Sequence, residues 1–507
     1  MDKGIKSYLL GIDVGTTSVK AVILNSAGDM FFSVSQEYAL ETGQNETCEL
    51  DAEVYWNITC QVIKKIIGKS EINPDHISGI AFSSQGETII MVDSSGKPLR
   101  KAIVWLDNRS VNEAGQIKDA FGAQYIMDIT GQPEVVSAWP ATRILWLRKN
   151  EPQIFDKVGK YLLVEDYLIF RMTGKYCTEY SLVSSTLYFD ISQKTWWKEM
   201  LDFLGISADQ LSELYQSGVS IGTLTTEAIS ATGLSTGTRC VTGAYDHPAG
   251  AIGSGNIKGG DVTLTIGASM AMCVAIDRPV SDLSVKLPCQ CHAIDGLYFL
   301  LPYGQTAGMV LKWFKDTFCS DEIEKAGLNR QDPYDLMIEQ AERIIPGADG
   351  LIMLPHLMGT GSPEFNPKVK GVFAGIAMGM NKGHFVRAII ESVAIMIHHN
   401  IETMRKMGIS INVIHVLGGG SKSNLWNQIL ADVTGLPLIT LINSENAAIG
   451  AGLLAGVGVG KFKDLDEACR FSVKTKQRFE PDMVNHKFYN GVYKKYLNLY
   501  GALEDFW

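Results

Sequence analysis

Residues 8–24, YLLGIDVGTTSVKAVIL, decide the fold of this chain. Apolar residues run from Tyr8 to Ile12, a polar turn with one glycine covers Val14–Thr17, and apolar residues return from Val19 to Leu24. Such runs on both sides of a glycine turn predict two paired strands. Asp13 then stands at the end of the first strand, directly before a turn rich in backbone N–H groups and hydroxyls.

A second unit of the same form covers residues 261–276, DVTLTIGASMAMCVAI. Gly267, Ala268 and Ser269 fall where Gly15, Thr16 and Thr17 fall in the first unit. Similarity at half-length is typical of internal duplication. Short strand–glycine–strand units are also common, so duplication and coincidence both remain open at this point.

Further strands and helices are expected to alternate along the chain. The patterns predict strands over 77–82 and 412–417, and helices over 52–67, 140–149, 162–172, 425–433 and 447–455. This alternation indicates an α/β fold. The glycine-rich segment 253–260 predicts a loop, which divides the chain into domains 1–254 and 255–507.

Composition excludes several classes of protein. The 507 residues are 46% hydrophobic and 20% charged, which is unlike a disordered chain, collagen or a coiled coil. The net charge of −10 argues against a nucleic-acid partner. Residues 1–4 enter a strand without a signal-peptide pattern, and no apolar run reaches the ~18 residues of a membrane helix. We therefore expect a cytoplasmic protein with no membrane partner.

Cysteine and glycine usage point the same way. There are 9 cysteines, and the one close pair, Cys289 and Cys291 beside His292, lacks a second cluster that would complete a zinc site. Buried or free thiols in a reducing compartment are expected. The 50 glycines exceed the usual share, which indicates tight turns and close backbone approach.

Three polar clusters could carry chemistry. Asp13 and its turn could hold a phosphate chain and Mg²⁺, or form an ordinary hairpin. Asp246, in the segment GAYDHPAG, could accept a proton from a substrate hydroxyl or cap a helix. The segment 417–424, LGGGSKSN, could hold a nucleotide against bare backbone, although it is neither a dinucleotide fingerprint nor a P-loop.

Polar residues at two strand ends are candidates for binding a polyhydroxy substrate. They lie in SSQGET, residues 83–88, and WLDNR, residues 105–109. Small polar ligands bind at such strand ends in open α/β sheets. The alternative for Asp107 and Arg109 is a surface salt bridge.

In this order, these pieces resemble the FGGY carbohydrate kinases of the actin, hexokinase and heat-shock ATPase superfamily. The most specific match is Gly371–Ile376 followed by His384–Glu391, which fits the family's C-terminal signature. The N-terminal signature fits less well: Pro140, Trp146 and Asn150 are in register, but Arg143 replaces the usual lysine and Ala138 is off pattern. The resemblance extends from residue 9 to about residue 456.

The resemblance implies two actin/hexokinase-like (ribonuclease H-like) domains that flank an ATP cleft. It also implies a phosphotransferase acting on an alcohol group, with ATP and Mg²⁺. Asp246 would be the catalytic base, and Asp13 and Asp246 would be associated with the metal. The nucleotide would contact Gly15, Thr16, Thr17, Lys20, Gly267, Ser269, Gly308, Lys312, Gly419, Gly420 and Asn424. Ala268 stands where many members have threonine, so one hydroxyl contact is in question.

The resemblance also implies a small sugar or polyol bound against the N-terminal domain. Its expected contacts are Gln85, Glu87, Trp105, Asp107, Arg109 and His247. Residues 85–88 depart from the Gln-Met-His pattern of xylulose kinases, and Gly86 replaces the arginine of glycerol kinases, which leaves room for a longer substrate. A ketopentose such as xylulose is expected, and a homodimer is possible.

Other functions stay open at this point. A glycerol, tetritol or other polyol kinase of the same family is one alternative. A non-catalytic ATPase scaffold on the same fold is another, and a sugar-sensing regulator is a third. Whether ADP release requires a sugar would separate the kinase from the scaffold.

Overall fold

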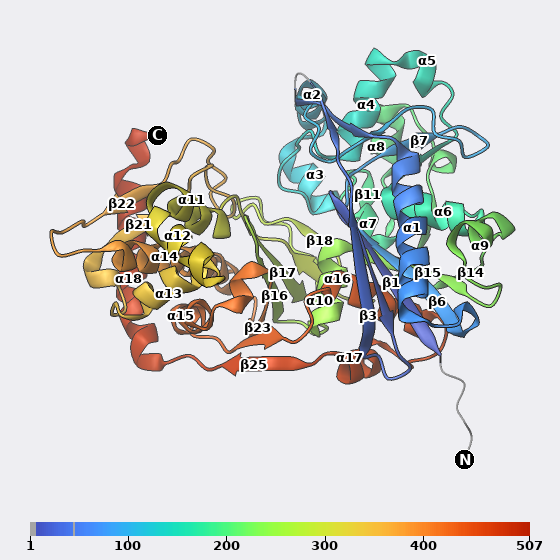
Figure 1. Ribbon diagram of the computed structural model, residues 1–507. Helices are drawn as coiled ribbons and strands as arrows, with labels where there is room; N and C mark the ends of the chain where they lie inside the picture. Colours follow the sequence, from blue (N-terminus) through green and yellow to red (C-terminus); the bar gives the residue numbers. More distant parts are fainter. Residues whose placement is uncertain (1–6, 44–45) are drawn as a thin grey trace.

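The computed structural model describes residues 7–43 and 46–507 as two lobes, each built around a β-sheet (Figure 1). The strand entry expected at residues 1–4 lies outside the described residues. Within the described part of the chain, no helix is both long and apolar enough to cross a membrane.

The first sheet is formed by the N-terminal part of the chain. Its strands lie in the order β14 (Ser220–Thr223), β15 (Arg239–Tyr245), β6 (Ile77–Ser84), β1 (Tyr8–Val14), β2 (Ser18–Leu24) and β3 (Met30–Glu37). β1 is buried at every residue except Asp13, because helices cover both faces of the sheet. The predicted β1–β2 unit is confirmed, and its register places Asp13 opposite Lys20.

The second sheet is formed by the C-terminal part of the chain. Its main path is β18 (Cys289–Cys291), β19 (Tyr298–Leu300), β17 (Met270–Ile276), β16 (Asp261–Ile266), β23 (Val413–Leu417), β24 (Leu438–Leu441) and β25 (Thr475–Phe479). β20 (Tyr303–Gly304) pairs with β17 off this path. The strands predicted over 261–276 and 412–417 are therefore present.

The two sheets have the same strand order and strand directions. In the first, β1 is antiparallel to β2 and parallel to β6, and β6 is parallel to β15. In the second, β16 is antiparallel to β17 and parallel to β23, and β23 is parallel to β24. The outer strands β3 and β14 correspond to β19 and β25. The internal repeat that the sequence left open is thus present in the topology.

Helices were predicted at the right places, with small errors at their ends. The principal helices are α1 (Ala52–Ser70), α4 (Pro140–Asn150), α6 (Val164–Thr173), α10 (Asp246–Ser254), α11 (Gly308–Phe318), α14 (Lys382–Lys406), α15 (Asn424–Thr434), α16 (Asn446–Gly458), α17 (Leu465–Ser472) and α18 (Met483–Ala502). α1 begins where the Asp51 side chain accepts from the Glu53 amide, and it ends at Glu71 in the left-handed conformation.

Smaller elements complete both lobes. Beside the first sheet lie α2 (Val111–Phe121), α3 (Ala123–Thr130), α7 (Tyr180–Val183) and α8 (Lys198–Leu204), with short strands such as β7 (Ile90–Val92), β8 (Ala102–Ile103) and β9 (Lys160–Leu162). Beside the second lie α12 (Ser320–Asn329), α13 (Pro333–Glu342), β21 (Ile352–Leu354) and β22 (Val372–Ala374). Residues 89–211 of the first lobe build a separate hydrophobic cluster of their own.

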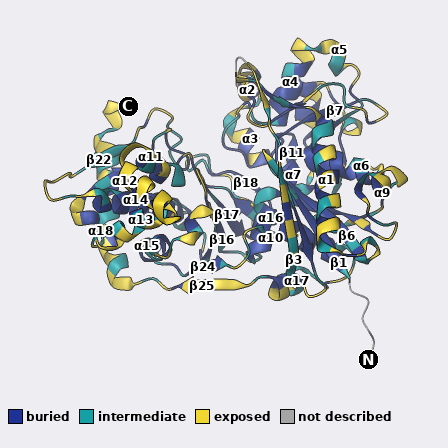
Figure 2. Ribbon diagram, viewed as in Figure 1, coloured by how far each residue is buried: buried dark blue, intermediate teal, exposed yellow. Residues whose placement is uncertain are grey.

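The two lobes meet at the crossed helices α10 and α16, which are almost wholly buried (Figure 2). A Cβ atom on Gly450 would lie 1.9 Å from the Ala249 carbonyl oxygen, and one on Gly253 would lie 1.9 Å from that of Asn446. Only glycine allows the backbones this approach. α16 also packs on β1, β6 and β15, so a helix from the C-terminal part of the chain covers the first sheet.

The predicted boundary loop at 253–260 needs correction. Gly253 and Ser254 belong to α10, and the chain leaves the helix only at Gly255, which has φ +82°. The sequence reasoning overlooked this because it took glycine for a loop residue, whereas Gly253 serves helix packing. The division of the chain into domains 1–254 and 255–507 stays a prediction.

Candidate active site

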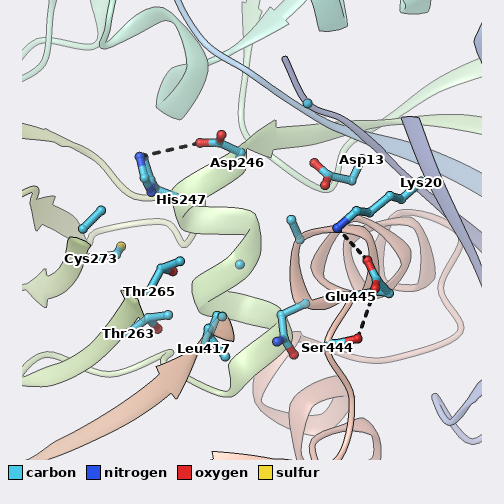
Figure 3. Close-up of a pocket in the computed structure, with 16 residues that line it drawn as sticks. Asp13, Lys20, Asp246, His247, Thr263, Thr265, Cys273, Leu417, Ser444 and Glu445 are labelled. Atoms are coloured by element: carbon cyan, nitrogen blue, oxygen red, sulfur yellow. Dashed lines mark hydrogen bonds and ion pairs between the residues drawn. The ribbon is translucent and has the colours of Figure 1, made fainter. Parts of the chain in front are cut away.

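Two cavities lie between the lobes and share Asp246, His247 and Ala271. The Asp13 cavity has a volume of about 330 Å³ (Figure 3). Its lining also includes Gly15, Lys20, Thr263, Thr265, Cys273, Leu417, Gly418, Ser444, Glu445 and Asn446. The Trp105 cavity has a volume of about 460 Å³. Its lining also includes Thr16, Gln85, Gly86, Glu87, Gln132, Glu134, Trp139, Ser269, Gln290, Tyr303, Gln305 and Phe365.

Asp246 is placed at the junction of the cavities by the end of β15. The Gly243 amide donates to Glu165 Oε1 at 2.7 Å, and the Tyr245 amide donates to Ser181 Oγ at 3.1 Å. α10 begins at Asp246 itself, and no side-chain cap bond is formed there, so the helix-cap interpretation is wrong. Burial raises the pKa of Asp246, and His247, whose Nε2 lies 3.9 Å from Oδ1, partly opposes the shift.

Asp13 and Lys20 form a charged pair of positions on the first sheet. Burial and the nearby Asp246 carboxylate raise the pKa of Asp13 to about 7, although Ser83 Oγ donates to Asp13 Oδ1 at 3.1 Å. Lys20 Nζ lies 3.0 Å from Glu445 Oε2, in the loop before α16 (Figure 3). Burial lowers the pKa of Lys20, but the bond to Glu445 outweighs it and the net shift is upward.

The two glycine turns are less open than the sequence suggested. The Gly15 amide donates to the Ser18 carbonyl at 3.0 Å, and the Gly267 amide donates to the Ser269 carbonyl at 2.9 Å. A hairpin of this kind closes with its own backbone bond, so neither glycine N–H is free for a phosphate in this conformation. Thr16 Oγ1 accepts from Trp105 Nε1 at 2.9 Å, and Thr17 is exposed beside the cavities.

Of the other expected nucleotide residues, Lys20 lines the Asp13 cavity and Ser269 lines the Trp105 cavity, but the remaining five line neither. Gly308 begins α11, and its amide donates to the Gly267 carbonyl at 2.9 Å. Lys312 points into solvent with 62% of its side chain exposed and pairs with Asp316. Gly418 is the glycine that reaches the Asp13 cavity, whereas Gly419 and Gly420 form a short helical turn and Asn424 begins α15 on the surface.

Four of the six expected substrate residues share the Trp105 cavity, namely Gln85, Glu87, Trp105 and His247. The cavity also contains Tyr303, Gln290 and Phe365 from the C-terminal half. Both lobes therefore form the cavity, and the position of a sugar against the N-terminal domain stays a prediction.

Asp107 and Arg109 do not line this cavity. Asp107 is fully buried, and its carboxylate accepts from the Cys48 amide at 2.6 Å and from Arg109 Nε at 2.8 Å. Arg109 also contacts Glu49 Oε1 at 2.6 Å. The salt-bridge alternative was therefore closer to the structure, although the pair is buried rather than on the surface. Because their polar groups are already paired with each other and with Cys48 and Glu49, both residues stabilise the loop that contains them.

Glu87 is held in a demanding conformation. Its φ is +58°, and its carbonyl accepts from Arg143 Nη1 at 2.7 Å. Arg143 is 1% exposed and also bonds the carbonyl of Trp105 at 2.8 Å, so one buried guanidinium joins both predicted substrate segments. Burial and the Asp246 charge raise the pKa of Glu87 to about 8, which favours a protonated side chain.

Sequence reasoning missed two groups of lining residues. Glu445 and Ser444 lie in a loop with no motif, and Gln132 and Gln290 are single amides in unremarkable segments. Only the crossing of α10 and α16, and the contact of β18 with the first lobe, bring them to the cleft. The family signature residues, by contrast, are structural: Arg387 and Glu391 form an ion pair at 2.8 Å inside the second lobe.

The cysteines lie in the interior of the protein. All nine are buried free thiols. Over residues 7–43 and 46–507, no group of three or more His, Cys, Asp and Glu side chains is arranged to hold a metal ion.

Comparisons with known proteins agree with this geometry. The model of the N-terminal domain of the FGGY family of carbohydrate kinases matches residues 8–253. The model of the C-terminal domain of the same family matches residues 262–459. A xylulose kinase of Bacillus subtilis strain 168 is 30% identical over 98% of this chain and 97% of its own length. A gluconokinase of Bacillus licheniformis is 32% identical over 98% of this chain and 96% of its own length.

The solved structures lead to the same family. The ligand-bound xylulose kinase of Lactobacillus acidophilus superposes with a TM-score of 0.89 at 27% identity, covering 98% of both chains. Two matched domains, full-length relatives and the same two-domain α/β architecture leave one assignment. The chain belongs to the FGGY family of carbohydrate kinases, phosphotransferases that act on an alcohol group.

Proposed function

We propose that the protein transfers the γ-phosphate of ATP to a hydroxyl group of a neutral ketopentose such as xylulose. The observation that carries this substrate class is the charge of the Trp105 cavity. Among the described residues that line it, the acidic side chains are Glu87, Glu134 and Asp246, and none is lysine or arginine.

This charge pattern favours a neutral sugar over an aldonate such as gluconate. A carboxylate taken from water into a cavity needs a cation or several donors in compensation, and unpaired it costs several kcal/mol. Lys286 and Lys118 approach the cavity only through Glu134, with N–O distances of 3.0 and 3.7 Å. The amides of Gln85, Gln132 and Gln290 instead suit neutral hydroxyl groups.

Asp246 supports the assignment of a base because it is the carboxylate common to both cavities. ATP would occupy the Asp13 cavity and the sugar the Trp105 cavity. As the sugar oxygen bonds to the γ-phosphorus, its proton passes to the Asp246 carboxylate and the bond to the ADP oxygen breaks. Burial of Asp246 strengthens it as a proton acceptor.

Asp13 and Asp246 fit a role beside Mg²⁺. Burial and then the nearby Asp246 carboxylate raise the pKa of Asp13, and a bound cation would favour the ionised form of Asp13. When bound with ATP, Mg²⁺ would neutralise phosphate charge. Lys20 and the hydroxyls of Thr263 and Thr265 would orient the phosphates from the two walls of the cavity.

The test is a coupled ADP-release screen of the purified protein with xylulose, ribulose, erythritol, glycerol and gluconate. We expect kcat/KM for a ketopentose to exceed that for gluconate by at least about a hundredfold, as one unpaired buried charge implies. A preference for gluconate would refute the neutral-substrate proposal. ADP release that needs no sugar would refute the kinase assignment itself.

Location and assembly remain predictions. Cytoplasmic location is expected from the sequence, and a homodimer is one possible assembly, which gel filtration with light scattering would test.

A further inference from the structure

The edge strand β18 belongs to the second sheet but is also attached to the first lobe. It pairs with β19 along one side. On the other side, the Cys289 amide donates to the Gly131 carbonyl at 2.9 Å, and the Cys291 amide donates to Ser184 Oγ at 3.1 Å. Gly131 has φ +71°, and a Cβ there would lie 2.0 Å from the Cys289 carbonyl oxygen. The two lobes thus meet backbone to backbone at this seam.

Two glutamines follow directly after the paired residues of the seam. Gln132 follows Gly131 and Gln290 follows Cys289, so the bonded backbones bring one amide side chain from each lobe to the Trp105 cavity. Both are buried, with exposures of 0% for Gln132 and 1% for Gln290.

The amides of these glutamines are incompletely satisfied. Gln132 Nε2 donates to the Ser184 carbonyl at 3.0 Å, but within the described residues its Oε1 has no hydrogen-bond partner. Gln290 Oε1 likewise has no partner in the described part of the chain. A buried amide without partners lowers stability, because it has lost its bonds to water and gained none. The described residues offer no hydrogen bond to the Gln290 amide oxygen, whereas a ligand hydroxyl in the cavity could donate one.

We propose that Gln290, from the C-terminal lobe, binds a hydroxyl group of the sugar and that Gln132, from the N-terminal lobe, does the same beside it. The sugar then contacts an amide of each lobe on the two sides of one seam. This inference rests on the proposed sugar kinase function and adds two residues that would determine substrate specificity. It also gives the sugar a direct means of fixing the position of one lobe relative to the other.

The two residues are unequal as probes. Replacing Gln132 removes its bond to Ser184, which also accepts from Cys291, so that variant would disturb the seam. Gln290→Met keeps the length of the side chain and removes only an amide whose oxygen is unpaired. Gln290→Met is therefore the sharper test.

The experiment compares Gln290→Met with wild type on the sugar that wild type turns over best in the screen. We expect kcat/KM for that sugar to fall about tenfold, as for the loss of one neutral hydrogen bond, while KM for ATP at saturating sugar is unchanged. Discrimination against one singly deoxygenated analogue should also collapse, because the variant no longer recognises that hydroxyl. Tm should stay equal or rise.

A matched control is Gln210→Met. Gln210 Nε2 donates to the Val158 carbonyl at 2.9 Å and its Oε1 accepts from the Ser207 amide at 3.1 Å, away from both cavities. This variant should lose Tm and keep wild-type kcat/KM, the opposite of Gln290→Met.

The outcomes separate the two proposals. If wild type is active and Gln290→Met has the same kcat/KM and sugar specificity, this inference alone is overturned. The same holds if Gln290→Met has a lower Tm but keeps its sugar specificity. Wild type that phosphorylates none of the sugars would overturn the proposed function, and the inference with it.

Discussion

The two walls of the Asp13 cavity come from the same sheet topology but carry different chemistry. On the first sheet, Asp13 lies opposite Lys20 in the β1–β2 register. On the second, Thr265 precedes Gly267 as Asp13 precedes Gly15, and it lies opposite Ala271 in the β16–β17 register. All four side chains line the cavity. One wall therefore presents a carboxylate and an ammonium group, and the other presents a hydroxyl and a methyl group.

This difference separates the role of the buried apolar residues from the role of the residues that face the cleft. The buried alternation of apolar residues sets the strand order, and that order is kept in both lobes. The positions that face the cleft are not needed for the core, so they can differ. A charged wall suits a metal and phosphates, whereas a small neutral wall suits close approach of the nucleotide.

The largest expected effect is that of Asp246→Asn, at the junction between the walls. Without the base, we expect sugar-dependent kcat to fall by about 10²–10⁴. ATP binding should survive, because the phosphates would still meet both walls. Steady-state kinetics and ATP titration by calorimetry measure the two quantities. A variant with near-normal kcat would remove Asp246 from the role of base.

The comparison of the walls is tested directly by Asp13→Asn and Thr265→Val. We expect Asp13→Asn to lower kcat by about 10²–10³ and raise the Mg²⁺ requirement, because a preorganised charge opposite the phosphates is lost. Thr265→Val removes one neutral hydrogen bond, so we expect no more than about a tenfold change. Kinetics over a range of Mg²⁺ concentrations would check both. Equal effects would show that the walls do not differ as proposed.

Glu87→Gln tests whether the buried Glu87 carboxyl, which lines the Trp105 cavity, is protonated. Because burial raises its pKa to about 8, the folded carboxyl keeps its proton up to about that pH, whereas the unfolded one ionises near the ordinary glutamate pKa of 4.5. Between these values the unfolded state binds fewer protons, so wild-type stability falls as the pH rises. The variant lacks this dependence, and its stability relative to wild type should grow by up to about 4 kcal/mol from pH 5 to pH 8.

Urea unfolding at several pH values measures this difference. Glu134→Gln is the matched control, because Glu134 lines the same cavity but pairs with Lys286 at 3.0 Å. If the stabilities of the two variants relative to wild type change equally with pH, the pH dependence of stability does not come from the buried carboxyl of Glu87.

The smallest effect is expected from Ala268→Thr on the neutral wall. Ala268 is exposed at the second turn, so a larger side chain fits there. An added hydroxyl would give at most one neutral hydrogen bond to a phosphate, and KM for ATP should fall by about two- to fivefold. An unchanged or higher KM for ATP would show that the second turn does not need this hydroxyl.

Much of the fold could be predicted from local pattern. Residues 8–24 and 261–276 encode their hairpins, and Asp246, singled out from the segment GAYDHPAG, lines the cleft. These features depend on periodicity and turn chemistry within a few residues. Predictions failed where an assignment needed partners distant in sequence. Asp107 and Arg109 appeared suited to a substrate, but Cys48 and Glu49 occupy them in the fold.

The sequence by itself thus determined the two hairpins, several of the helices and the family, whereas the role of Asp246 as base stays a prediction. The tertiary structure alone decided which side chains share a cavity. Gly253 and Gly450 became contacts between helices, Glu445 became the partner of Lys20, and Gln290 reached the cavity across a seam between lobes. The physical reason is that hydrophobic periodicity is a local property, whereas the contents of a cleft depend on how two independently built sheets are docked.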